Sequence, residues 1–243
     1  MEQKFNLPTE TVLLPSKGLM YPSGSALASG EVEMKYMTAK EEDILSNQNY
    51  IANGTVIDKL LESLIVDKKI NYGELLIGDK NAIMVAARIL SYGKDYTFNW
   101  RGKDHTVDLS TLENKEINYD KIKDSNNNFK FVLPQSGVNV TFKLLNHSDE
   151  KAIDREEKGL QKINPDSTAA MTTRLKRMIT SVDGNTESKD IRQFVDEYLL
   201  AADARALRKE YTDISPDVNI IFTTDAGEEV DLPIGIGFFW PDA

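Results

Sequence analysis

Leu199-Leu-Ala-Ala-Asp-Ala-Arg-Ala-Leu207 and Leu75-Leu-Ile-Gly-Asp-Lys-Asn-Ala-Ile83 are two versions of one pattern, Leu-Leu-x-x-Asp-x-x-Ala followed by Leu or Ile. An Asp that precedes apolar residues at helical spacing is typical of a helix N-cap. The sequence therefore predicts that Asp79 and Asp203 each cap a new helix. It also predicts that the long helical pattern around the second copy breaks near Ala202.

Further matches surround these two stretches in the same order along the chain. They are the turns Leu14-Pro-Ser-Lys-Gly18 and Leu133-Pro-Gln-Ser-Gly137, the alternating strands 31–37 and 138–145, the helix starts Thr38-x-x-Glu41 and Asn146-x-x-Asp149, and the strands Val107-Asp-Leu109 and Val230-Asp-Leu232. Matches that recur in one order indicate a tandem duplication. The alternative is that units built from hairpins and helices look alike through their patterning alone.

The expected architecture is an α+β fold made of two tandem related modules. Each module is predicted to contain a β-hairpin, then helices, then a second β-hairpin. The N-terminal module spans residues 1–112 and the C-terminal module spans residues 129–243. Residues 113–128 are rich in Asn, Lys and Asp and are interpreted as a linker. We expect the two modules to pack through their helices.

The net charge and the lack of long apolar runs argue against two classes of partner, nucleic acids and membranes. The 243 residues carry a formal net charge of −10 and include no cysteine. The negative charge opposes binding to a phosphate backbone, so we expect no nucleic-acid partner. The polar start of the chain predicts no signal peptide, and no apolar run is long enough to cross a bilayer, so no membrane partner is expected.

Residues that could support catalysis are sparse. The two histidines, His105 and His147, both lie beside predicted turns, where a surface or capping role is favoured over catalysis. The sequence has no nucleophile elbow, phosphate-binding loop or calcium loop. We therefore predict that the protein is not an enzyme and has no catalytic residues, no cofactor and no metal site.

Three features are candidates for binding a protein partner. Three adjacent aromatic residues near the C-terminus either close the core, which we favour, or form a docking plug. The insertion from Leu19 to Gly30 either contacts a partner or is a plain flexible loop. A basic cluster is either a solvated helix face or binds an acidic partner or the other module's carboxylates. The candidate partner-binding residues are Leu19, Tyr21, Leu27, Arg174, Arg177, Phe238, Phe239 and Trp240.

Several motifs together resemble a known family. They are Leu14-Pro-Ser-Lys-Gly-Leu-Met-Tyr-Pro22, Met37-Thr-Ala-Lys-Glu-Glu-Asp-Ile-Leu45, Gly78-Asp79 with Arg88-Ile-Leu-Ser-Tyr-Gly93, Asp149-Glu-Lys-Ala-Ile153, Thr173-Arg-Leu-Lys-Arg-Met-Ile179 with Ser181-Val-Asp-Gly184, and Phe238-Phe-Trp-Pro241. This set is similar to the baseplate proteins of T-even-type contractile-tailed bacteriophages, a family that includes baseplate hub assembly proteins. The similarity spans nearly the whole chain.

The resemblance implies a non-enzymatic factor that helps assemble the hub of the tail baseplate in the host cell cytoplasm. The alternative is a permanent structural subunit of the virion tail baseplate. Its partners are expected to be other hub proteins and, as a second option, further copies of this chain. Relatives in such families often carry Cys-x-x-Cys pairs at hairpin tips, like a zinc ribbon. The equivalent places, Trp100–Asp104 and Thr224–Glu228, have no cysteine, so no metal is expected there.

Overall fold

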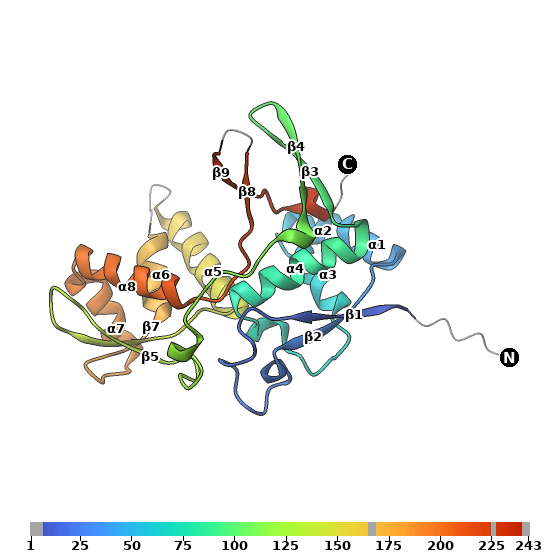
Figure 1. The fold of residues 1–243 in the computed structure, drawn as a ribbon. Helices are drawn as coiled ribbons and strands as arrows, with labels where there is room; N and C mark the ends of the chain where they lie inside the picture. Colours follow the sequence, from blue (N-terminus) through green and yellow to red (C-terminus); the bar gives the residue numbers. More distant parts are fainter. Residues whose placement is uncertain (1–6, 165–168, 225–226, 240–243) are drawn as a thin grey trace.

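The computed structural model describes residues 7–164, 169–224 and 227–239, and within them the chain forms an α+β fold (Figure 1). The described strands form four small antiparallel sheets, and helices lie between and around them. Buried apolar residues from both halves of the chain belong to one hydrophobic cluster. No helix among the described residues is both long and apolar enough to span a membrane.

The first half runs from two strands, through helices, to a hairpin. Its elements are β1 (Thr9–Leu13), a 3-10 turn (Ala26–Ser29), β2 (Glu31–Lys35), α1 (Ala39–Leu45), α2 (Gln48–Ala52), α3 (Val56–Leu64), a 3-10 turn (Tyr72–Glu74), α4 (Ile77–Tyr92), β3 (Asp95–Trp100) and β4 (Lys103–Asp108). Two more 3-10 turns, Leu109–Thr111 and Tyr119–Lys121, lead into the second half.

The second half also runs from two strands, through helices, to a hairpin, and it has a further strand, β7, between two of its helices. Its elements are β5 (Phe129–Val132), β6 (Asn139–Phe142), α5 (His147–Ile163), α6 (Ala170–Met178), β7 (Ile179–Val182), α7 (Ser188–Gln193), a π-helical turn (Phe194–Tyr198), α8 (Ala201–Ile214), β8 (Ile221–Thr223), β9 (Glu229–Asp231) and a 3-10 turn (Ile236–Phe239).

The predicted capping boxes are confirmed in both halves. Thr38 pairs reciprocally with Glu41 at the start of α1, and Asn146 pairs with Asp149 at the start of α5. In each box the acid also binds a lysine from the end of the preceding strand or just after it. Lys35 lies 2.7 Å from Glu41, and Lys143 lies 2.7 Å from Asp149. The same set of contacts therefore fixes the corner between strand and helix twice.

Each half also pairs its opening hairpin with the chain that follows a later helix. In the second half, β7 follows α6 and pairs antiparallel with β6, with Phe142 opposite Ile179. In the first half, Ile65 follows α3 and forms an isolated antiparallel bridge with Met34 of β2. The strand β7 covers Ile179–Val182, and a turn at Asp183 and Gly184 follows it.

The predicted break near Ala202 is confirmed, but the predicted cap residue is wrong. The π-helical turn ends at Tyr198, and α8 begins at Ala201. The N-cap residues of α4 and α8 are Leu76 and Leu200, and neither makes a side-chain cap. Asp79 and Asp203 are the third residues of these helices, and their carboxylates bind other segments instead.

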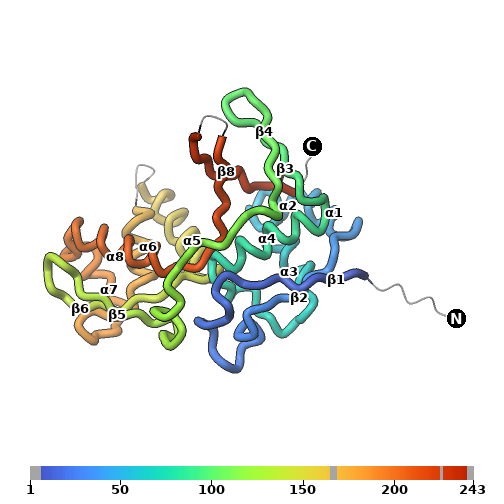
Figure 2. Tube along the Cα trace, viewed as in Figure 1, coloured from blue at the N-terminus to red at the C-terminus, as the bar shows by residue number. Residues whose placement is uncertain are grey.

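The two halves contact each other, and the segment between them is packed rather than flexible. The hairpins β3–β4 and β8–β9 project side by side from the body (Figures 1 and 2). The predicted linker 113–128 packs against the protein, because Asn114 bridges Val218 and Ile122 is fully buried. The predicted boundaries between modules, and their origin by duplication, stay predictions.

Candidate functional site

Asp79 is fully buried and binds the loop that joins β1 to β2. Its carboxylate accepts hydrogen bonds from the Ser16 N–H at 2.9 Å, the Ser16 hydroxyl at 2.6 Å and the Tyr21 hydroxyl at 2.6 Å. Burial raises the pKa of Asp79, while these three donors favour the ionised form. The Tyr21 oxygen also accepts from the Leu76 N–H at 2.9 Å, so Tyr21 joins the loop to the start of α4.

The loop from Leu19 to Gly30, predicted either to contact a partner or to be a plain flexible loop, is folded onto the protein. Leu27 and Tyr21 are buried, and Leu19 is half-buried and packs against the core. Burial, followed by the nearby Asp79 carboxylate, raises the pKa of the Tyr21 phenol far above its usual range. Tyr21 and Leu27 therefore hold the loop in place. A role in partner contact stays a prediction for Leu19, whose side chain is partly accessible.

Asp203 makes the corresponding contact in the second half. Its carboxylate accepts from the Gln135 N–H at 2.7 Å and the Ser136 N–H at 3.0 Å. Burial raises the pKa of Asp203, but these two N–H groups lower it overall. Asp203 thus holds the Leu-Pro-x-x-Gly turn of its own half, as Asp79 does in the first.

The predicted basic cluster lies on α6 and is paired with acids of the same half. Arg174 lies 3.7 Å from Glu150, and Arg177 lies 3.2 Å from Asp149. Between them, Lys176 binds Asp196 at 2.7 Å. These cations therefore contact carboxylates of the second half, although the arginine side chains remain partly exposed. Binding to an acidic partner stays a prediction.

The aromatic residues near the C-terminus lie in the core. Phe238 and Phe239 are buried and pack edge-to-face with ring centroids 5.2 Å apart. Phe238 also meets Tyr96 of β3, and the turn that holds both rings contacts α4. This is the core alternative that we favoured for the two phenylalanines. Trp240 lies outside the described residues.

The tips of the two projecting hairpins are joined by side chains. Arg101 and Glu228 form two parallel hydrogen bonds of 2.9 Å. Lower down, the rings of Phe98 and Phe222 are 5.5 Å apart and edge-to-face. The β3–β4 tip is a two-residue turn in which Arg101 and Gly102 both have positive φ, as a type I′ hairpin requires. Among the described residues, no group of three or more His, Asp and Glu side chains could hold a metal ion.

A cluster of ionisable side chains lies where α3 of the first half meets α5 of the second. Asp58 contacts His147 Nε2 at 3.3 Å, Lys151 Nζ at 2.7 Å and the Tyr72 hydroxyl at 3.2 Å. Lys80 Nζ lies 3.2 Å from His147 Nδ1. A lysine ammonium can only donate, so Nδ1 accepts and Nε2 carries the proton that is donated to Asp58.

Electrostatics at this cluster favours an ionised Asp58. Burial raises the pKa of Asp58, but His147, Lys151 and Lys80 together lower it well below its usual range. Both ring nitrogens of His147 are engaged by these neighbours. The cluster therefore acts as an electrostatic bond between the halves, and it leaves no histidine nitrogen free to accept a proton from a nucleophile.

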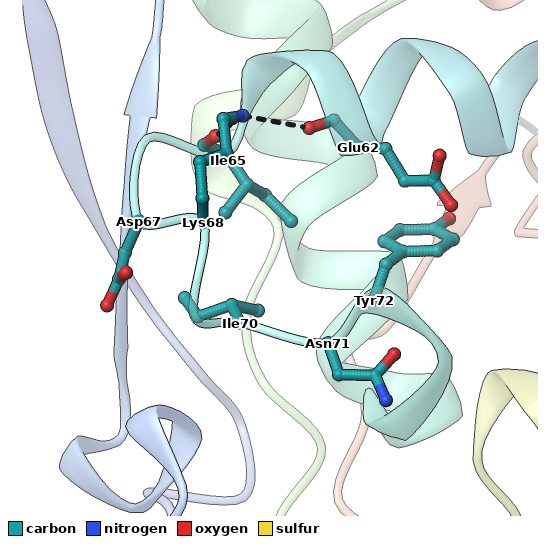
Figure 3. A pocket seen from close by; sticks show the side chains of 7 residues that line it. All are labelled: Glu62, Ile65, Asp67, Lys68, Ile70, Asn71 and Tyr72. Carbon is teal, nitrogen blue, oxygen red and sulfur yellow. Dashed lines mark hydrogen bonds between the residues drawn. The ribbon is translucent and has the colours of Figure 1, made fainter.

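Hollows lie near this cluster. One, of about 620 Å³, is lined by Asp58, Lys80, His147 and the exposed side of α5. A second, of about 300 Å³, is lined by Asp58, Tyr72, His147 and Lys151. A third, of about 210 Å³, lies at the end of α3 and is shown in Figure 3. There the Lys68 ammonium donates to the carbonyl oxygens of Glu62 and Ile65, which satisfies backbone acceptors at the helix end.

A backbone contact also joins the two halves. The His147 N–H donates to the Leu75 carbonyl at 2.9 Å, and Leu76 forms an antiparallel bridge with Asn146. We call this contact the internal joint. Sequence reasoning did not find it or the Asp58 cluster, because their contacts between the halves join residues 67 or more positions apart. The one available signal was His147 itself, which lies directly after a capping residue.

Comparison with known proteins gives one finding. A family model described as T4 bacteriophage base plate protein matches residues 11–228, a range that includes both Leu-Leu-x-x-Asp stretches. No curated protein and no solved structure gives a match.

Proposed function

Because this chain belongs to the T4 bacteriophage base plate protein family, we propose that it is a non-enzymatic assembly factor for the central hub of the tail baseplate. The observation that carries the proposal is the family match over most of the chain. A role in the tail baseplate follows from the family itself. The finer proposal is that the protein binds other hub proteins in the host cell cytoplasm and holds them until the next component joins.

The geometry supports a binding role over a catalytic one. The buried polar groups at the two sites described above bind one another: Ser16 donates to Asp79, and His147 lies between Lys80 and Asp58. A nucleophile needs a neighbouring base that is free to accept its proton. Among the described residues, Ser16 has an acid partner and no histidine partner for its hydrogen bonds, which favours a structural role for it.

The test separates an assembly factor from a permanent subunit. Phage that lack the gene should form no complete baseplates, and the protein supplied from a plasmid should restore them. Mass spectrometry of purified particles should then find the protein absent or far below the amount of the baseplate subunits. A stoichiometric amount in the particles would favour the alternative, a permanent structural subunit.

The same complementation assay tests the non-enzymatic part of the proposal. His147→Gln keeps a side chain that can accept from Lys80 and donate toward Asp58, but it cannot act as a general base. If the variant folds, it should restore particle assembly at the wild-type level. Loss of assembly by a folded His147→Gln protein would count against a purely binding role.

A further inference from the structure

We infer that one copy of this chain binds a second copy end to end, with Leu199 and Leu200 of one copy seated on the corner 36–39 of the next. This corner joins β2 to α1. The inference rests on the internal joint and does not depend on the proposed function, because a permanent subunit could associate in the same way.

The internal joint shows what a Leu-Leu helix start binds. Leu76, the N-cap of α4, is only 4% exposed, and it lines one small hollow together with Leu144 and Leu145. The backbone beside it accepts the His147 N–H through the Leu75 carbonyl. The partner of this helix start is therefore a strand-to-helix corner that consists of two apolar residues followed by a capping box.

The second half has a corresponding helix start, Leu199 and Leu200 before α8, but no strand-to-helix corner of the described chain binds it. Leu76 accepts from the Lys80 N–H, and Leu200 accepts from the Ala204 N–H in the same way at the start of α8. Leu200 is 42% exposed, about ten times the value for Leu76. Within the described chain, no group donates to the Leu199 carbonyl, which corresponds to the Leu75 carbonyl of the internal joint.

The first half carries the matching corner, also without a partner. The capping box at Thr38 corresponds to the box at Asn146, so Ala39 stands where His147 stands. Ala39 is exposed, and its N–H has no acceptor in the part of the chain that the structure describes. Tyr36 and Met37 are half-buried, whereas the corresponding Leu144 and Leu145 are buried by the internal joint.

The occupant is a second copy because the two unpaired surfaces cannot meet within one chain. The corner 36–39 lies beside α1 at one end of the molecule, and the break between α7 and α8 lies at the other end (Figure 1). A contact between two different surfaces is heterologous, so repeated copies form a ring or a filament.

The contact between copies is expected to be weaker than the internal joint. At the internal joint, Asp58 binds Lys151. The corresponding positions by sequence alignment of the halves are Thr172 and Asp43, which cannot form an ion pair. Each copy also carries a net charge of −10, so repulsion between copies should be screened as salt is added. We therefore expect reversible association that strengthens with ionic strength.

Two variants test the two surfaces separately. Leu200→Glu places a charge on the exposed leucine. Ala39→Pro removes the proposed donor, and proline is well tolerated at the first position of a helix. Thr38 has φ −121° and ψ 173°, the extended conformation that a residue before proline adopts. Leu13→Glu is the matched control, because Leu13 is 67% exposed on β1, outside the proposed contact.

Sedimentation of the full chain over a concentration series should show dimers and larger species for the wild type and for Leu13→Glu. Leu200→Glu alone and Ala39→Pro alone should be monomeric. An equimolar mixture of the two should form dimers and nothing larger, because each variant retains one intact surface. A wild-type chain that stays monomeric at about 1 mM, and so has a Kd weaker than that, would overturn the inference. So would a mixture that contains only monomers.

Discussion

The carboxylate of Asp203 accepts a hydrogen bond from the backbone N–H of Gln135, at 2.7 Å and 68 positions earlier in the chain. Asp79 makes the same contact with Ser16 at 2.9 Å. Each Asp is the third residue of its helix, and each donor follows the proline of a Leu-Pro-x-x-Gly turn. A buried carboxylate thus fastens the opening hairpin of each half to a later helix.

Replacing Asp79 with Ala should destabilise the protein by about 3 kcal/mol. The substitution leaves the Ser16 N–H, the Ser16 hydroxyl and the Tyr21 hydroxyl buried without their acceptor. Urea denaturation followed by circular dichroism measures the change in the free energy of unfolding. Asp43→Ala on the exposed side of α1 is the control and should change stability by less than about 0.5 kcal/mol. Equal effects of the two substitutions would contradict this account.

Glu41 should make the stability of the protein depend on pH in the acid range. Burial raises its pKa, but hydrogen bonds from Lys35, Thr38 and Ser63 lower the pKa from 4.5 to about 2. Because the folded-state pKa is the lower one, the stabilisation is fully present above the unfolded-state pKa and is lost as pH falls from about 4.5 to about 2.

Glu41→Gln should therefore be less stable than the wild type at neutral pH, and the difference should shrink as the pH falls through this range. Thermal melts between pH 7 and pH 2 measure it. Asp43→Asn, which changes an exposed carboxylate two positions away, should keep the wild-type acid dependence. A constant difference between Glu41→Gln and wild type at all pH values would refute the assignment.

Asp58→Asn should lower the free energy of unfolding by about 3 kcal/mol, because it leaves the partly buried Lys80 and Lys151 of the contact between the halves without a carboxylate. A double-mutant cycle with Lys151→Met isolates the pair and should give a coupling of about 1 kcal/mol, since Lys151 is partly exposed. Lys158→Met is the control second substitution, because Lys158 lines the same hollow but forms no ion pair with a described residue, and it should show no coupling to Asp58→Asn.

Gly78→Ala and Gly159→Ala should have opposite effects although both glycines lie in helices. A Cβ atom at Gly78 would lie 1.9 Å from the Pro216 carbonyl oxygen, so α4 and the chain after α8 must separate. A Cβ atom at Gly159 meets nothing within 4 Å. We expect Gly78→Ala to cost about 2–3 kcal/mol and Gly159→Ala to add up to about 1 kcal/mol. Calorimetry of both variants measures the change in stability. A Gly78→Ala variant as stable as the wild type would contradict the close approach of Gly78 to the Pro216 carbonyl.

Local patterns predicted local structure well. Features that depend on residues within one turn of helix could be predicted from the sequence. They are the capping boxes at Thr38 and Asn146 and the helix break before Ala202. The role of Asp203 could not be predicted, because its partners, Gln135 and Ser136, lie in a turn that is distant in sequence. An Asp at the third helical position looks like an N-cap in sequence when the true N-cap is an apolar residue such as Leu200.

The candidate surfaces were harder to predict than the helices. Tyr21 and Leu27 looked like apolar points on an exposed loop, since nothing local to them shows that Asp79 draws the loop inward. The Asp58 cluster was missed for the same reason. Burial of a loop is decided by contacts between distant segments, which composition and periodicity do not report.

The position of Phe238 and Phe239 has a consequence for synthesis on the ribosome. Both rings fill space against α4 and Tyr96, which emerge more than a hundred residues earlier. The first half of a nascent chain therefore keeps part of its apolar interior open to solvent until residues 238 and 239 have been synthesised. During that interval the growing polypeptide is exposed to chaperones and to aggregation, and ribosome pausing before Phe238 is added should prolong it.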